Sequence, residues 1–207
     1  SYFFFPGGVD IKKFKKPKNE NIKLKNKFLN LKKPIIGFLG QIKNVIDVDL
    51  IKKITKKFKN CSLVLVGPID SDMKNLKNIS ENIKLLGKQN HKDIPFILNQ
   101  FKVGIIPYVK NSFTNSINPA KLNEYIASNL SVVSTNLNEV VNYNKNNKNI
   151  VLVSKNHNEF LNNISISLKK NKQNYKSISR KYDWKIIFEN VLEQCGLNQI
   201  NKNKKEF

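Results

Sequence analysis

The sequence has no long apolar run and no basic leader segment. A helix that spans a membrane needs about 20 consecutive, mostly apolar residues, and no run among these 207 residues approaches that length. The first residues, SYFFFPGGVD, are partly apolar but carry no Lys or Arg, so they do not fit a secretory signal peptide. We therefore expect a cytoplasmic protein without a membrane-spanning helix.

Arginine is nearly absent, although the chain is strongly basic. Arg180 is the single arginine among 37 Lys and Arg residues, and the net charge is +22. Arginine is the residue that binds guanine edges and phosphates in a fork, so a lysine-only surface argues against specific recognition of nucleic acid. The lysines are spread along a chain that is also rich in Asn and Ile, which indicates a compositional bias. A weak attraction to anionic membranes is expected at this charge.

Cysteine and histidine are too few and too scattered for a metal site. Cys61 and Cys195 lie far apart, without the spacing of zinc ligands. Cys61 directly precedes an apolar segment and is interpreted as a small buried hydrophobic residue. His91 and His157 lie in Lys- and Asn-rich surroundings, which predicts solvated side chains. We expect no metal and a reducing compartment.

Short apolar segments alternate with helical patterns along the chain. The predicted strands lie at 34–40, 61–68, 82–87, 103–108 and 149–154, with a further helix and strand inside 116–136. The other predicted helices lie at 47–58, 92–101, 158–170 and 183–196. Continuously apolar strands that alternate with helices are typical of a parallel sheet covered on both faces. The pattern predicts an α/β fold, a doubly wound Rossmann-like sheet of about six strands.

Three common nucleotide and hydrolase motifs are missing. The segment GFLGQI spaces its glycines wrongly for the dinucleotide fingerprint G-x-G-x-x-G, and no G-x-x-x-x-G-K-[ST] loop occurs. No serine stands in G-x-S-x-G. These absences argue against an NAD enzyme, a P-loop NTPase and a serine hydrolase.

The loops after the strands are the expected ligand site, because ligands of such sheets bind beyond the carboxyl ends of the strands. They are Gly40–Ile46, Gly67–Asp72, Gly87–Lys92, Pro107–Asn118 and Ser134–Val140. Glycine at a strand end lets backbone approach a ligand closely, although it can also simply end the strand. Loop 107–118 is long and polar, which is typical of a functional loop.

The helix after loop 107–118 has the features of a phosphate site. Asn118 is a good N-cap and Pro119 a good first residue, and the free amides of Ala120, Lys121 and Leu122 are expected to face the loop. Glu124 lies near the same end of the helix, where its carboxylate could accept hydrogen bonds from the two hydroxyls of a ribose. The alternative for Glu124 is an ordinary surface charge near the helix dipole.

Segment 116–136, SINPAKLNEYIASNLSVVSTN, resembles the donor-site motif of retaining GT-B glycosyltransferases of family 4, especially the subgroup related to teichuronic-acid transferases. Other segments resemble the same family in order: FFFPGGVDIKKF, PIIGFLGQIKNVIDVDLI, SLVLVGP, IKLLGKQNHKDIPFILNQFKVGIIPY and YDWKIIFENVLE. The resemblance covers about residues 4–196. It implies the C-terminal half of a GT-B enzyme, the half that binds a nucleoside-diphosphate sugar.

The resemblance also implies roles for individual residues. Glu124 matches the second Glu of an E-x7-E motif and would hold the ribose, whereas Ser116 stands where the first Glu is usual, near the sugar. Gln41 stands where many members carry a phosphate-binding Arg, and Lys43 is a candidate substitute. Lys88 and Gln89 match the loop around the base. Together with the residues inferred from spacing, the predicted donor-site residues are Gly40, Gln41, Lys43, Gly67, Lys88, Gln89, Ser116, Ile117, Asn118, Pro119, Lys121, Leu122 and Glu124.

The function implied is retaining, metal-independent sugar transfer to a glycan or a lipid-linked acceptor, with no cofactor. Residues 1–8 would end a missing N-terminal acceptor domain or linker, 9–196 would be the donor-binding domain, and 197–207 a basic, disordered tail. Alone, this chain should bind a nucleotide weakly and transfer nothing. Two alternatives stay open: a non-catalytic basic module on nucleic acid or membrane, and a fragment of a GT-B-type sugar epimerase.

Overall fold

The computed structural model describes residues 7–15, 21–117 and 120–195. Its centre is one sheet of six parallel strands in the order β3-β2-β1-β4-β5-β6. The strands are β1 (Ile35–Leu39), β2 (Ser62–Val66), β3 (Ile83–Gly87), β4 (Val103–Ile106), β5 (Ser131–Thr135) and β6 (Val151–Ser154). Every residue of β1, β2 and β4 is buried, which confirms the α/β doubly wound sheet and the six predicted strands.

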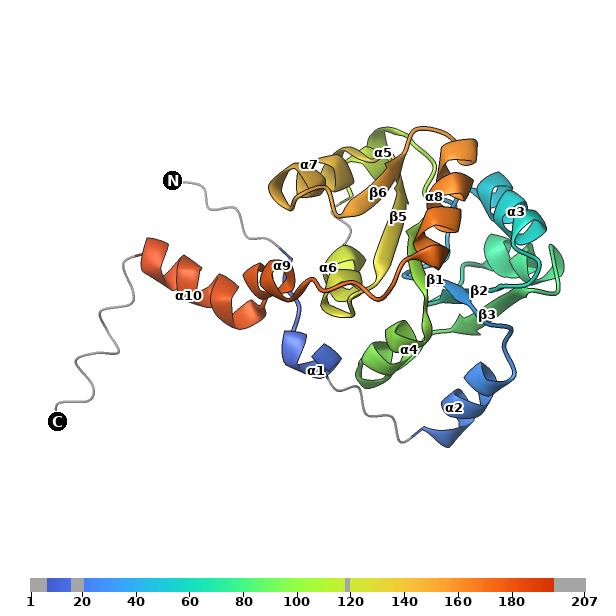
Figure 1. Cartoon of the computed structure of the whole chain (residues 1–207), viewed down its shortest axis with the longest axis horizontal. Helices are drawn as coiled ribbons and strands as arrows, with labels where there is room; N and C mark the ends of the chain where they lie inside the picture. Colours follow the sequence, from blue (N-terminus) through green and yellow to red (C-terminus); the bar gives the residue numbers. More distant parts are fainter. Residues whose placement is uncertain (1–6, 16–20, 118–119, 196–207) are drawn as a thin grey trace.

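Helices cover both faces of this sheet (Figure 1). One face carries α3 (Val48–Lys57) and α8 (His157–Lys169), which pack on each other. The other face carries α4 (Ile94–Gln100), α6 (Ala120–Ala127) and α7 (Asn138–Asn146). The chain order reverses between β1 and β4, so the crevice expected in a doubly wound sheet lies at the carboxyl ends of these two strands.

The remaining helices lie around the edge of the domain. They are α1 (Ile11–Lys15), α2 (Ile22–Leu29), α5 (Ser112–Asn115), α9 (Lys176–Lys181), α10 (Trp184–Gln194) and two 3-10 turns, Ser71–Asn78 and His91–Asp93. Figure 1 shows α10 extending away from the sheet, and it follows directly on α9. Among the described residues, no helix has the length and apolar character that a membrane span requires.

An aspartate stands at or near the start of three predicted helices, 47–58, 92–101 and 183–196, and it caps two of them. Asp47 caps α3 by accepting a hydrogen bond from the amide of Leu50 (2.8 Å), and Asp183 caps α10. The predicted helix 92–101 is instead a 3-10 turn followed by α4. Asp93 makes no cap there, because its buried carboxylate accepts a hydrogen bond from the side chain of Asn21 (3.5 Å).

The Lys- and Asn-rich composition of segment 12–27 predicts little structure, and this prediction is wrong for the described part of the segment. Helix α2 begins at an Asn21 cap, and its Leu24 and Phe28, four residues apart, are both buried. The surrounding lysines hid this apolar pair in the composition. Helices α5, α7 and α9 were not predicted either. Residues 16–20, and 1–6 and 196–207 with most of the proposed linker and tail, lie outside the described residues.

Candidate functional site

A buried tyrosine fixes α6 at the crevice. Strands β1 and β4 are paired only at residues 36–37 and 103–104, and beyond that point the hydroxyl of Tyr125 lies between them. It accepts a hydrogen bond from the amide of Leu39 (2.8 Å) and donates one to the carbonyl of Ile105 (3.4 Å). Tyr125 is fully buried, and its ring lies so close to Gly104 that a Cβ there would sit 2.9 Å from it. The first turns of α6 are therefore held over the crevice.

Lys121 brings a poorly hydrated positive charge to this crevice. Its Nζ donates to the hydroxyl of Tyr108 (2.6 Å) and lies over two aromatic rings, 4.9 Å from the centre of Tyr108 and 5.6 Å from that of Phe38. Desolvation by burial lowers the pKa of Lys121 to about 8, nearby Glu124 opposes the shift and nearby Lys43 adds to it. A phenol and two π faces stabilise an ammonium only modestly. An anion entering the crevice would be strongly attracted to this charge.

The two glycines at the crevice are explained by packing. At Gly40, with φ +147°, a Cβ would lie 2.7 Å from Cε of Lys121, so the missing side chain makes room for the lysine. At Gly67, with φ +143°, a Cβ would lie 1.9 Å from the carbonyl oxygen of Gly40, so the two loops touch backbone to backbone. The further prediction, that Gly40 and Gly67 let a ligand approach the backbone, remains a prediction.

Glu124 lies in a pocket beside the crevice rather than on an open helix surface. The pocket has a volume of about 430 Å³ and is lined by Glu124, by His91 from the segment after β3, and by Gly8 and Trp184. Desolvation by burial raises the pKa of Glu124, while the fields of His91 and Lys121 oppose this. The neighbouring Asn123 ties α6 to the start of the described chain, since its side-chain amide donates to the carbonyl of Gly7 (2.7 Å). This burial disfavours the alternative of a solvated surface charge.

Other predicted residues of the loops after β1 and β3 mostly have partners of their own. The side-chain amide of Gln41 donates to Asp70 (3.0 Å), and Nζ of Lys43 lies 5.3 Å from the ring centre of Phe113. Gln89 donates to the carbonyl of Leu86 (2.6 Å). Lys88, in contrast, is exposed.

The remaining predicted residues belong to the segment that leads into α6. Ser116 is exposed and its hydroxyl donates to the carbonyl of Ser112 (3.2 Å), while Ile117 packs on the core. Leu122 is buried in the core, so only its backbone could face a ligand. The predicted Asn118 and Pro119 lie outside the described residues.

The long loop 107–118 is a folded segment. Asn111 and Thr114 form a capping box that starts α5, and the fully buried hydroxyl of Thr114 donates to the carbonyl of Val109 (2.6 Å). Its first part pairs with the segment after β1: the amide of Asp47 donates to the carbonyl of Pro107 (2.8 Å), and that of Val109 to the carbonyl of Val45 (2.9 Å). This pairing holds the loops after β1 and β4 together at the crevice.

Sequence reasoning missed the aromatic residues that hold the site. Tyr108, Phe38 and Tyr125 were all interpreted as parts of apolar segments, and nothing in their spacing showed that two hydroxyls would face the crevice. His91 was predicted to be solvated; it is exposed, yet it also lines the pocket of Glu124. The one signal available in the sequence was proximity along the chain, because Tyr108 and Tyr125 lie in the motifs next to Lys121.

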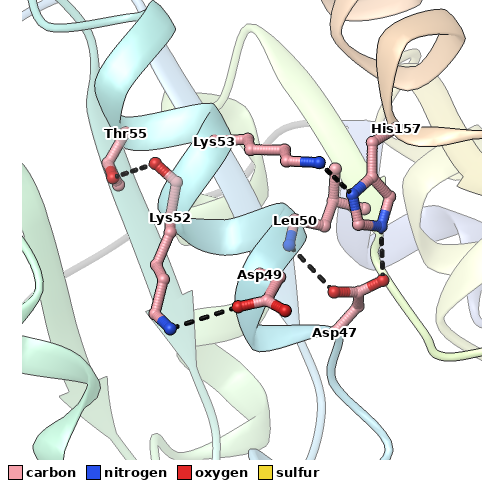
Figure 2. A network of polar contacts seen from close by, with 7 residues as sticks. All are labelled: Asp47, Asp49, Leu50, Lys52, Lys53, Thr55 and His157. Carbon is pink, nitrogen blue, oxygen red and sulfur yellow. Dashed lines mark hydrogen bonds and ion pairs between the residues drawn. The ribbon is translucent and has the colours of Figure 1, made fainter.

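The prediction of a solvated side chain is wrong for His157. Figure 2 shows its ring between α3 and α8, where Nε2 lies 2.7 Å from Oδ2 of Asp47 and Nδ1 lies 3.0 Å from Nζ of Lys53. The capping residue of α3 thus also binds the first residue of α8, because the two helices pack on the same face. Within 7–15, 21–117 and 120–195, no group of three or more His, Cys, Asp and Glu side chains could hold a metal ion.

Comparison with known proteins identifies the family. The family model described as "Glycosyl transferases group 1" matches residues 33–170. The chain is 24% identical over 174 residues to TuaH of Bacillus subtilis (strain 168), which by name is a teichuronic acid biosynthesis glycosyltransferase; the match spans 80% of this chain and 44% of TuaH.

Solved structures show the same fold. The Anabaena protein Alr3699/HepE, crystallised with UDP and glucose, has a TM-score of 0.70 at 14% identity over 91% of this chain and 55% of its own. The C-terminal domain of a glycosyl transferase group 1 family protein (LpcC) from Francisella tularensis has a TM-score of 0.60 at 16% identity, over 86% of this chain and 100% of its own. The chain thus spans about half of two of these relatives. It belongs to the family of group 1 glycosyl transferases and has the fold of a GT-B C-terminal domain.

Proposed function

We propose that the chain is the donor-binding half of a glycosyltransferase and binds a nucleoside-diphosphate sugar at the crevice between β1 and β4. The observation that carries the proposal is Lys121, a half-buried ammonium with aromatic neighbours and a lowered pKa at the start of α6. A diphosphate would bring negative charge that balances the positive charge of this ammonium. The Anabaena relative was crystallised with UDP and glucose, which supports a donor of this class.

The pocket next to Lys121 suits the nucleoside. Glu124 is a half-buried carboxylate, and the two adjacent hydroxyls of a ribose can each donate a hydrogen bond to it. We assign Lys88 and Gln89, after β3, to the base, and Ser116 to the sugar end, with Ile117 to Lys121 along the diphosphate. These assignments extend the roles that the sequence resemblance implies.

The proposed transfer retains the configuration of the sugar and uses protein charges where other glycosyltransferases use a metal. Retention follows from the sequence resemblance to retaining enzymes. Lys43 lies close enough to Lys121 for its charge to lower the pKa of Lys121. Two ammonium groups and the amides at a helix start can stabilise the developing charge on a leaving diphosphate.

The acceptor is proposed to bind on a second domain. The chain spans 44% of TuaH and 55% of HepE, so the relatives have room for a further domain of similar size. Closure of two halves over the crevice would orient the sugar and exclude water. The group that attacks or assists the sugar would then come partly from the other half, and this half alone would bind the donor without transferring it.

Calorimetry with nucleoside diphosphates tests the proposal. The 207-residue chain is titrated with UDP, GDP and ADP, and then as the Lys121→Met and Glu124→Gln variants. Removal of a charged hydrogen-bond partner should weaken binding of the preferred nucleotide by about 1.5–3 kcal/mol. Lys74→Met and Glu193→Gln, at exposed positions outside the pocket of Glu124, are the matched controls and should leave affinity unchanged. Equal affinity in the Glu124 and Glu193 variants would refute the ribose assignment.

A second candidate function, a peripheral contact with an anionic membrane, rests on a different surface. At the amino ends of β2 and β3, a hollow of about 1170 Å³ is lined by five lysines and one glutamate. The lysines are Lys32, Lys52, Lys56, Lys59 and Lys84. Each lysine near an anionic surface adds about 1 kcal/mol of attraction. Co-sedimentation with anionic vesicles at two salt concentrations tests this contact, because attraction by exposed charges weakens with salt.

A further inference from the structure

Helix α2 is apolar on two opposite faces. Its inner face carries Leu24 and Phe28, which are both 2% exposed. Its outer face carries Ile22, 69% exposed, and Leu29, 78% exposed, and these are the two most exposed large apolar side chains among the described residues. Residues seven positions apart in a helix lie in one row, about 10 Å from each other along the axis. Single exposed apolar residues are ordinary on a surface, whereas two in one row can enter an apolar layer together.

The side chains around this apolar row are basic. Residues 22–33, IKLKNKFLNLKK, contain five lysines and no Asp or Glu. Lys25 lies on one side of the row, and Lys23 and Lys27 lie on the other, and all three are exposed. Among the described residues, no carboxylate forms an ion pair with these three lysines. The outer face of α2 therefore suits a partner that is both anionic and apolar.

The inner face fixes α2 on the domain. The ring of Phe28 packs edge to face on Phe96 of α4, with 5.9 Å between the ring centres, and Nζ of Lys33 lies 5.8 Å from the centre of the Phe28 ring. The side chain of Asn21 caps the helix by accepting a hydrogen bond from the amide of Leu24 (3.1 Å). A helix held in this way presents its outer side chains without rearrangement, which lowers the cost of binding.

Helix α2 and the proposed donor site lie at opposite ends of the sheet. The helix leads into the amino end of β1 (Figure 1), whereas the carboxyl ends of β1 and β4 form the crevice. The segment that follows α2, residues 30–32, lines the lysine hollow at the amino ends of β2 and β3. Helix α2 therefore ends at the border of this hollow. A partner bound to both would leave the crevice open to a nucleotide.

We propose that α2 anchors the protein on an anionic lipid bilayer by inserting Ile22 and Leu29 below the headgroups. The inference rests on the second candidate function, contact with an anionic membrane, and adds the side chains that enter the membrane. The lysines of α2 and of the hollow bind the anionic headgroups, while their long stems lie along the apolar layer. A bilayer offers this combination of outer negative charge and inner apolar layer. Salt does not abolish such binding, because burial of apolar side chains is not an interaction between charges.

Co-sedimentation with vesicles tests the anchor. The 207-residue chain is mixed with vesicles of equal parts phosphatidylglycerol and phosphatidylcholine, at low and high salt. Ile22→Ser combined with Leu29→Ser should weaken binding about tenfold or more, because burial of even one such side chain is worth about a factor of ten. The matched control, Ile166→Ser combined with Leu192→Ser, removes one exposed Ile and one exposed Leu from α8 and α10 and should change binding less than twofold. Equal losses in the two double variants would overturn the proposal.

Fluorescence reports whether the outer face of α2 enters the bilayer. The native chain has a single tryptophan, Trp184, so it is the reference for Leu29→Trp. Emission of the Leu29→Trp variant should shift to shorter wavelength with the phosphatidylglycerol vesicles and should be quenched by lipids brominated in their acyl chains. Ile166→Trp is the control and should show neither change. The same response in both variants, or none in Leu29→Trp, would refute insertion through α2.

The remaining outcomes separate the anchor from the proposed functions. If Lys56→Gln combined with Lys59→Gln in the hollow weakens binding and the α2 substitutions do not, the membrane contact stands and the anchor is refuted. No binding of the native chain to these vesicles would refute both. All variants should bind UDP with the affinity of the native chain, and failure of UDP to bind refutes the donor site alone. A dimer without vesicles that the α2 substitutions dissociate, seen by sedimentation velocity, would identify a second copy as the occupant and overturn the proposal.

Discussion

Removing the charge of Lys121 should make the free protein more stable while it weakens the donor site. The half-buried side chain lies against Phe38, Tyr108 and the Gly40 backbone, and desolvation lowers its pKa from 10.5 to about 8. A difference of that size corresponds to about 3 kcal/mol of unfavourable free energy in the folded, protonated state. Lys121→Met keeps the unbranched stem and removes this cost. Loss of the contacts with Tyr108 offsets about 1 kcal/mol, which leaves a gain of about 2 kcal/mol.

The pH dependence of this stability difference follows from the pKa of Lys121 in the unfolded and folded states. Below pH 8 the lysine is protonated in both states, so the full cost of burial is present. Between about pH 8 and 10.5 the folded protein loses the proton first, so the native chain gains stability relative to the variant and the difference shrinks toward zero. Other groups that titrate in this range cancel when native and variant are compared.

Urea unfolding at pH 7 and pH 9.5 measures the effect. At pH 7 the variant should be more stable by about 2 kcal/mol, which raises the melting temperature by roughly 4–8 °C for a chain of this size. At pH 9.5 most of the difference should be gone. Two results would refute the view that desolvation of the Lys121 cation destabilises the folded protein. One is a variant less stable than the native chain at pH 7, and the other is a stability difference that does not change with pH. Lys74→Met, at an exposed position, is the control and should change stability by less than 0.5 kcal/mol, as is usual on surfaces.

Three further predictions concern the same crevice. Tyr125→Phe leaves the buried amide of Leu39 without its partner, and unfolding in urea should show a loss of about 1–3 kcal/mol. Gly67→Ala forces a Cβ against the carbonyl of Gly40 at φ +143° and should cost about 2 kcal/mol or more in the same assay, whereas a neutral effect would contradict the backbone contact. Affinity for UDP should fall as the pH rises above about 8, by up to tenfold per pH unit, because Lys121 loses its proton; calorimetry from pH 7 to 9 checks this, and a flat profile would exclude Lys121 as the charged partner.

The sheet was predictable because its central strands β1, β2 and β4 are buried on both faces. Continuous apolar runs such as 62–66 are typical of a parallel strand covered on both faces. Right-handed crossovers with helices on both faces then require the strand order to reverse within the sheet. Helix α2 was not predictable in the same way. Its buried side consists of just Leu24 and Phe28, and the lysines around them dominate any window of sequence.

The candidate site was predictable in its charged residues and not in the residues that hold them. Lys121 and Glu124 stand out in a helix that follows a polar loop. Tyr108 and Tyr125 do not, because an aromatic residue in an apolar segment has the same pattern whether its hydroxyl is satisfied by a distant strand or faces a ligand. The bond between Asp47 and His157 joins residues 110 positions apart, and no local rule of sequence connects them.

The central claim is that a diphosphate binds against Lys121 with the ribose at Glu124. The most direct measurement is a crystal structure of the 207-residue chain with UDP. The account predicts phosphate oxygens about 3 Å from Nζ of Lys121, and the two ribose hydroxyls hydrogen-bonded to the carboxylate of Glu124. A nucleotide bound away from the crevice between β1 and β4, or a Lys121 still bonded only to Tyr108 with UDP present, would contradict it.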